Sequence, residues 1–81
     1  MIYHFDMPRI LQFRDNQCRT KVGTYRLFKE VGIQFAELLS DENITIYFGE
    51  CREEALAACC EDYRNRSKEI EHGRLYHSIG V

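Results

Sequence analysis

The clearest elements of this chain lie in residues 43–73, NITIYFGECREEALAACCEDYRNRSKEIEHG. Ile44, Ile46 and Phe48 occupy alternate positions in its first part, and Gly49 follows them. Side chains in a strand point alternately to opposite faces, so this spacing places the three apolar side chains on one face. The pattern predicts a half-buried strand that packs its apolar face on the core.

The segment that follows this strand has several features of a helix. Acidic residues at its start suit the positive end of the helix dipole, and Gly73 stands where a C-terminal glycine cap belongs. Cys51 is placed to act as the N-cap, with the Glu54 side chain reaching back to it in a capping box. We therefore expect a helix over about residues 50–73. Its apolar residues recur at helical spacing at Leu56, Cys59, Cys60, Tyr63 and Ile70.

Upstream of these elements, residues 25–39 carry an apolar stripe with a spacing close to that of a helix. The stripe consists of Leu27, Phe28, Val31, Phe35, Leu38 and Leu39. Thr24 suits the N-cap position, so the pattern favours a helix over residues 25–39. Gly32 argues against it, because glycine costs about 1 kcal/mol inside a helix. The residues around Gly32 also alternate as a strand would, and a strand is the alternative.

Residues 9–22 have the pattern of a β-hairpin. Asp15 and Asn16 form its two-residue turn, because both residue types tolerate a positive φ. In that register Phe13 faces Cys18, one face of the hairpin is mostly apolar and the other is mostly basic. The hairpin therefore combines a core-facing side with a charged side.

The two ends of the chain each carry one further apolar segment. Residues 2–5 and residues 74–81 are both expected to form short strands, the second one closing the fold. A chain of 81 residues holds one domain at most, so residues 1–81 form a single domain. The predicted fold class is α+β, with a mixed or antiparallel sheet, built from the hairpin and further strands, packed against two helices.

Charge is unevenly distributed, although the formal net charge is only −2. Residues 9–29 hold six Lys or Arg against Asp15 alone. Residues 41–62 hold seven Asp or Glu against Arg52 alone. Such polarity steers encounters and influences the choice of partner, whereas it says little about the fold. The simplest interpretation of both segments is a solvated surface that keeps a small domain soluble.

Four cysteines and three histidines raise the question of a metal or redox site. No CxxC pair is present, and Cys59 and Cys60 are adjacent, so the spacing of a structural zinc site is missing. We expect four free thiols and no cofactor. Two alternatives are a reactive Cys51 at the helix start and a Cys18 nucleophile with His4 as its base.

Signatures of enzymes are missing from the sequence. It contains no P-loop, GxGxxG, GxSxG or HExxH motif, so we expect a protein that is not an enzyme. The first functional hypothesis is an interaction module that binds a protein partner through charged surfaces. The protein-binding residues would be Glu50, Glu53, Glu54, Glu61 and Asp62 on the acidic helix.

The alternative hypothesis is nucleic-acid binding through the basic hairpin 9–29. Basic side chains would neutralise phosphates, while a tyrosine could stack on a base. The residues that would do this are Arg14, Arg19, Lys21, Tyr25 and Arg26. The sequence also allows a homodimer in which the two charged surfaces meet. No apolar run is long enough to cross a membrane and no basic, apolar leader begins the chain, so we expect a cytoplasmic protein.

Residues 45–63, TIYFGECREEALAACCEDY, resemble the strand and "EEAL" helix of HicB-like antitoxins. The resemblance covers 19 of the 81 residues, and the three-stranded meander that precedes this helix in the family is not evident in the sequence. It implies a small α+β domain that neutralises a toxin. The small size and the missing motifs are also similar to the accessory inhibitors carried by phages and mobile elements.

Overall fold

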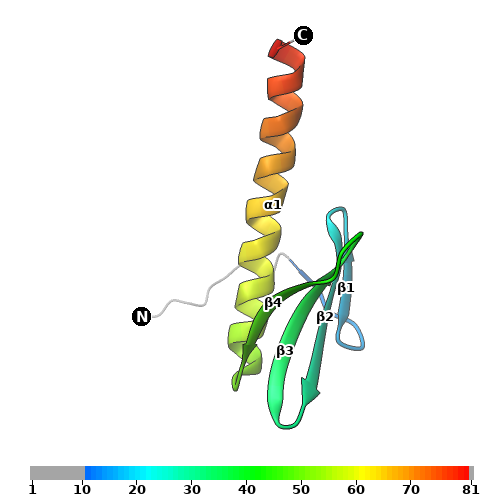
Figure 1. Cartoon of the computed structure of the whole chain (residues 1–81), viewed down its shortest axis with the longest axis vertical. Helices are drawn as coiled ribbons and strands as arrows, with labels where there is room; N and C mark the ends of the chain where they lie inside the picture. Colours follow the sequence, from blue (N-terminus) through cyan, green and yellow to red (C-terminus); the bar gives the residue numbers. More distant parts are fainter. Residues whose placement is uncertain (1–10, 81) are drawn as a thin grey trace.

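The computed structural model describes residues 11–80, with side chains described for residues 11–70. This part of the chain forms a four-stranded antiparallel sheet and one long helix (Figure 1). The strands follow one another in the sheet in their chain order, and the helix packs on one face. The elements are β1 (Gln17–Thr20), β2 (Gly23–Glu30), β3 (Ile33–Leu39), β4 (Ile44–Gly49) and α1 (Arg52–Gly80).

The architecture confirms an α+β domain with an antiparallel sheet, but the expectation of two helices is wrong for the described residues. The segment expected to be the first helix forms two strands instead. The predicted strand over residues 2–5 lies outside the described residues.

The turn at Asp15 and Asn16 is confirmed, since the two residues have φ of 54° and 64°. The backbone amides and carbonyls of Arg14 and Gln17 bond to each other across it. The predicted pairing of the two flanking segments is nevertheless wrong, because it is reduced to the single bridge between Arg14 and Gln17. β1 pairs with β2 instead, and their register joins Cys18 to Tyr25.

Residues 25–39 form the β2–β3 hairpin, so the predicted helix is wrong and the strand alternative is the observed one. Val31 and Gly32 make the two-residue turn with φ of 52° and 77°, between the paired residues Glu30 and Ile33. Positive φ at both central positions is the geometry that matches the twist of a two-stranded ribbon. Thr24, expected to cap a helix, lies within β2.

β4 confirms the predicted strand but not its side-chain alternation. The register with β3 shifts between Ala36 and Glu37, whose partners are Tyr47 and Thr45, so Ile46 is the extra residue of a β-bulge. A bulge reverses the orientation of the residues that follow it. Tyr47 therefore packs against the core, while Phe48, expected inside, is 70% exposed.

α1 begins close to the predicted position and continues further than predicted. It passes through Gly73, which is therefore not a cap, and ends at Gly80. The closing strand expected over residues 74–81 is accordingly wrong for residues 74–80, which are helical. A glycine weakens a helix by only about 1 kcal/mol relative to alanine, which is too little to end it by itself. The second half of α1 extends beyond the sheet (Figure 1).

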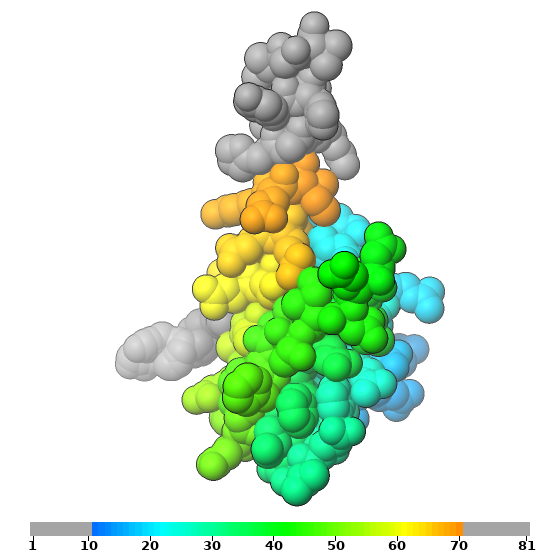
Figure 2. Space-filling view, viewed as in Figure 1, coloured from blue at the N-terminus to red at the C-terminus, as the bar shows by residue number. Residues whose placement is uncertain are grey.

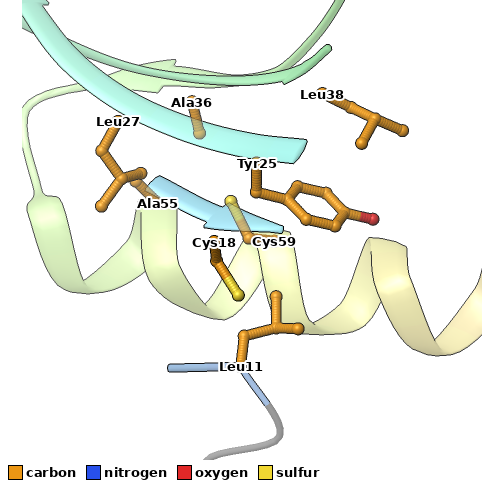
Figure 3. Packing of buried hydrophobic residues seen from close by; sticks show 8 residues of the cluster. All are labelled: Leu11, Cys18, Tyr25, Leu27, Ala36, Leu38, Ala55 and Cys59. Carbon is orange, nitrogen blue, oxygen red and sulfur yellow. The ribbon is translucent and has the colours of Figure 1, made fainter. Parts of the chain in front are cut away.

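The core lies between the sheet and the first half of α1 (Figure 3). Small residues of the helix, Ala55 and Cys59, face the strands and are fully buried, so the helix approaches the sheet closely. The buried apolar residues are Leu11, Cys18, Tyr25, Leu27, Ala36, Leu38, Ala55 and Cys59. The opposite face of the sheet, which we call the open face, carries no helix of the described chain.

Candidate functional site

The five acidic residues predicted to bind a protein occupy two different environments. Glu50, Glu53 and Glu61 are exposed, and no ion pair to them is found within residues 11–70. Glu54 and Asp62 instead accept hydrogen bonds from tyrosines of the sheet. The acidic surface of the helix is therefore partly free and partly used to attach the helix to the sheet.

Asp62 is at the centre of a half-buried polar network. The Tyr25 hydroxyl donates to Asp62 Oδ2 over 2.6 Å, and Arg66 Nε donates to the same oxygen over 2.7 Å. Burial and the bond to the Asp62 carboxylate raise the pKa of Tyr25 well above its usual range. The hydrogen bond to Asp62 likewise raises the pKa of Arg66. These contacts fix Tyr25 as a neutral donor and neutralise much of the charge of Asp62.

The start of α1 is held by a tyrosine from β4. The Tyr47 hydroxyl donates to Glu54 Oε1 over 2.9 Å and accepts the backbone N–H of Cys51 over 3.3 Å. The predicted capping box is therefore bridged by the Tyr47 hydroxyl instead of closing directly. Burial is the largest cause of the raised pKa of Tyr47. Gly49 makes room for this arrangement, because a Cβ there would overlap the Tyr47 hydroxyl and lie 2.8 Å from Cζ of its ring.

A groove of about 400 Å³ runs between β4 and α1, and we call it the β4–α1 groove. β4 is the edge strand of the sheet, and no strand among residues 11–80 pairs with its outer side. Figure 2 shows β4, in green, alongside the first half of α1, in yellow-green and yellow. The groove is lined by Ile44, Thr45, Ile46, Ala58, Glu61, Asp62, Asn65 and Arg66.

The residues of the predicted nucleic-acid site are separated by the fold. Arg14, Arg19 and Lys21 are exposed. Tyr25, expected to stack on a base, is completely buried and bonded to Asp62. Arg26 lies on the open face with its guanidinium carbon 4.5 Å from the centre of the Phe28 ring. The basic residues are therefore at the surface, while the stacking residue is in the core.

The open face carries a feature that the sequence reasoning missed, which we call the phenylalanine row: Phe28, Phe35 and Phe48. Phe28 and Phe35 stack with ring centres 5.1 Å apart and planes at 9°. Phe35 and Phe48 follow with centres 6.5 Å apart and planes at 41°. The sequence did contain a sign of this row. In residues 25–39 apolar residues occupy both even and odd positions, which is expected when both faces of a strand pair are apolar.

The four cysteines are unpaired in the structure. Burial raises the pKa of Cys59 to about 12, so this thiol stays protonated at neutral pH. Cys18 is buried as well, while Cys51 and Cys60 are half-buried. His4, proposed as a base for Cys18, lies outside the described residues. No group of three His, Cys, Asp or Glu side chains suited to a metal ion is found in the described part of the chain.

Within residues 11–80, no helix combines the length and the apolar character that a membrane span requires. No protein-family model, no curated protein and no solved structure matches the chain, so the resemblance to HicB-like antitoxins rests on residues 45–63 alone.

Proposed function

We propose that the chain is a non-catalytic interaction module that binds an extended segment of a partner protein in the β4–α1 groove. The observation that supports this most strongly is the position of the groove. An edge strand forms one wall, and the acidic surface of α1 forms the other. An extended segment can add to such an edge, where backbone hydrogen bonds supply affinity and side-chain pockets supply specificity.

The lining of the groove indicates the chemistry of the segment. Ile44, Ile46 and Ala58 offer apolar contacts to alternate side chains of an added strand. Asp62 is already bonded to Tyr25 and Arg66, so Glu61 is the carboxylate left to attract a cation. The favoured ligand is a segment in which apolar residues alternate with polar ones and one Lys or Arg lies opposite Glu61.

The remaining acidic residues act at longer range in this proposal. Glu50, Glu53 and Glu54 lie near the start of α1 and increase the negative potential around the groove. Charges of this kind mostly change the rate of association and its dependence on salt. An inhibitor-like or antitoxin-like role would use the groove to hold a segment of the target protein.

The absence of catalysis in this proposal is supported by the state of two of the thiols, those of Cys18 and Cys59. Cys59 and Cys18 are buried, and the pKa of Cys59 is raised to about 12. A nucleophilic cysteine needs the opposite, a lowered pKa and access to a substrate. The polar network of Tyr25, Asp62 and Arg66 is internally satisfied and attaches the helix to the sheet.

Selection from a random peptide library displayed on phage, against the immobilised chain, tests the proposal. We expect enriched peptides with alternating apolar residues and at least one Lys or Arg. Binding of the best peptide should fall about tenfold in Glu61→Lys. Glu53→Lys is the matched control, since it makes the same charge change on the same helix outside the groove. Equal losses in both variants, or none in either, would contradict binding in the groove.

Nucleic-acid binding is retained as the alternative function, now with Arg14, Arg19 and Lys21 as its surface. These side chains are exposed, but the buried Tyr25 supplies no stacking ring. We expect only weak binding that disappears with salt, because a few phosphate contacts are lost quickly above about 0.1 M. Fluorescence anisotropy with single- and double-stranded oligonucleotides measures it. Submicromolar binding at physiological salt, abolished by Arg19→Glu with Lys21→Glu, would favour the alternative.

A further inference from the structure

The open face combines an apolar centre with charged residues of both signs. The phenylalanine row crosses β2, β3 and β4, and Phe48 at its end is 70% exposed. Arg26 and Glu37, one step along the strands from Phe28 and Phe35, are direct cross-strand partners. Large exposed aromatic side chains beside polar ones are typical of a protein interface.

We propose that the open face binds the open face of a second copy of this chain, around a two-fold axis that runs parallel to the strands between β2 and β3. Two sheets that pack face to face lie about 10 Å apart with their strands within about 30° of each other. The interface is then isologous, with the same surface on both subunits. The dimer leaves α1 and the β4–α1 groove outside the contact.

The register of β2 and β3 makes this surface self-complementary. Rotation about the proposed axis places each residue of β2 over the β3 residue with which it pairs within its own chain. Phe28 pairs with Phe35 within the chain, so Phe28 of one copy faces Phe35 of the second copy, and Phe35 faces Phe28. Arg26 pairs with Glu37, so each charge faces an opposite charge. The interface therefore contains an aromatic centre and two symmetric ion pairs.

A two-fold axis across the strands gives a worse match. It would place each strand against the same strand of the second copy. Arg26 would then face Glu30, but Glu37 would face Ile33, whose side chain is apolar and 40% exposed. That arrangement would bury the Glu37 carboxylate against an apolar surface without a partner, which is costly. Charge complementarity selects the axis parallel to the strands.

The two charges are available for such a contact. Arg26 and Glu37 are neighbours in the sheet, yet no ion pair between them is found among residues 11–70. Arg26 Nε is buried without a hydrogen-bond partner within the same residues. Buried donors of this kind are uncommon in native proteins. A carboxylate from a second copy would give the guanidinium the acceptor that its own chain does not supply.

The ring geometry favours a protein over a nucleic acid on this face. Stacking on Phe35 and the Arg26 guanidinium over the ring occupy the surfaces of Phe28 that a base would need. Aromatic rings of a second copy can pack edge to face against this stacked pair. Glu30 and Glu37 on the open face offset the positive charges of Arg19 and Arg26 there, which weakens the attraction to phosphates.

Sedimentation equilibrium of the full chain tests the dimer directly. We expect a species of twice the 9.6 kDa chain mass. Arg26→Glu and Glu37→Arg each create two like-charge contacts across the axis, so each variant alone should dimerise about a hundredfold more weakly. Circular dichroism at the same concentration checks that both variants are folded. The double variant with both changes in one chain restores opposite charges and should regain the dimer.

Mixing the two single variants gives the sharpest result. One presents two carboxylates and the other two guanidinium groups, so the mixture should form a heterodimer although neither variant dimerises well alone. A matched control uses Arg64→Glu and Glu69→Arg, two exposed residues of α1 away from the open face. These variants should each dimerise like the wild type, alone and mixed.

Several outcomes would overturn the proposal. The proposal is wrong if the wild-type chain stays monomeric at high concentration or if the single charge variants dimerise normally. It is also wrong if the mixture of the two variants associates no more tightly than each variant alone. Phe48→Ser tests the interface without any change of charge. This side chain is exposed, so it can be replaced without loss of folding. Its dimer should be weaker, and an unaffected dimer would place the interface elsewhere. A monomer that binds a single-stranded oligonucleotide through Arg26 would assign the face to nucleic acid.

Discussion

Tyr25 joins the sheet to the helix through one hydroxyl group. Its ring is fully buried, and its hydroxyl donates to Asp62. Tyr25→Phe keeps the ring and removes the donor, so we expect the free energy of unfolding to fall by about 2 kcal/mol, the range for hydrogen bonds to charged groups. Urea unfolding measures this loss. Tyr63→Phe is a suitable control, because the tyrosine hydroxyl bonds found within residues 11–70 are those of Tyr25 and Tyr47. Equal losses in both variants would show that the Asp62 contact contributes little.

The same tyrosine and Cys59 determine how stability responds to alkaline pH. Burial raises the pKa of Cys59 from 9.0 to about 12, and that of Tyr25 rises from 10.0. A group whose pKa is higher in the folded state contributes fully to the free energy of unfolding at pH values below its unfolded pKa. This contribution is lost as the pH rises from the unfolded pKa toward the folded pKa. The free energy of unfolding should therefore be level up to about pH 9 and decline above it. Urea unfolding as a function of pH measures this, and Cys59→Ala should make the decline begin about one pH unit later.

Gly49 is required by the path of a neighbouring side chain. A Cβ at this position would overlap the Tyr47 hydroxyl that bridges Cys51 and Glu54. We expect Gly49→Ala to destabilise the fold by about 2 kcal/mol, in the range of a local clash with loss of a cap. A double-mutant cycle with Tyr47→Phe checks the cause, because the two losses should not add. Additive losses would mean that Gly49 serves another purpose.

The turn between β2 and β3 contains a strained residue. Val31 has a φ of 52° and is 97% exposed, although β-branched residues rarely adopt this conformation. Asn at this position of such a turn is strongly preferred. Val31→Asn should therefore raise the free energy of unfolding by about 1 kcal/mol, as the thermal midpoint or urea unfolding will show. No change would indicate that the strain is relieved elsewhere in the hairpin.

This hairpin also explains why the sequence favoured a helix over residues 25–39. Leu27 faces the core while Phe28 belongs to the phenylalanine row, so both faces of β2 carry apolar side chains. Two apolar faces hide the period of two that identifies a strand. The turn adds to the ambiguity, because Val31 is an unusual residue for a positive φ. The fold class, the Asp15–Asn16 turn, β4 and the start of α1 could all be predicted from local pattern.

The candidate site was less predictable than these elements, for a physical reason. Charge patterns reveal that residues are at the surface, and Glu53 and Glu61 are exposed as expected. They do not reveal which charges the tertiary structure uses, and Asp62 is bonded to a tyrosine 37 positions away. The β-bulge at Ile46, which exposes Phe48, likewise depends on pairing with β3. Contacts between distant segments therefore decided which residues form the surface.

At the scale of the whole molecule, the proposed dimer makes the thermal unfolding midpoint depend on protein concentration. Association stabilises the folded state by mass action, so dilution lowers the thermal midpoint. We expect scanning calorimetry of the wild type to show this dependence, while Arg26→Glu shows little of it. A midpoint that is independent of concentration in both would contradict dimerisation through the open face.

The strand order has a kinetic consequence. Each strand pairs with the next one along the chain, and the β1–β2 and β2–β3 connections are two residues each. Loops this short close in well under a microsecond, and folds dominated by such local pairing cross their folding barrier quickly. During synthesis the whole sheet precedes the helix that covers Leu27, Ala36 and Leu38. A nascent sheet therefore exposes apolar side chains on both faces until α1 emerges, and this interval is when the chain is most exposed to aggregation and to capture by chaperones.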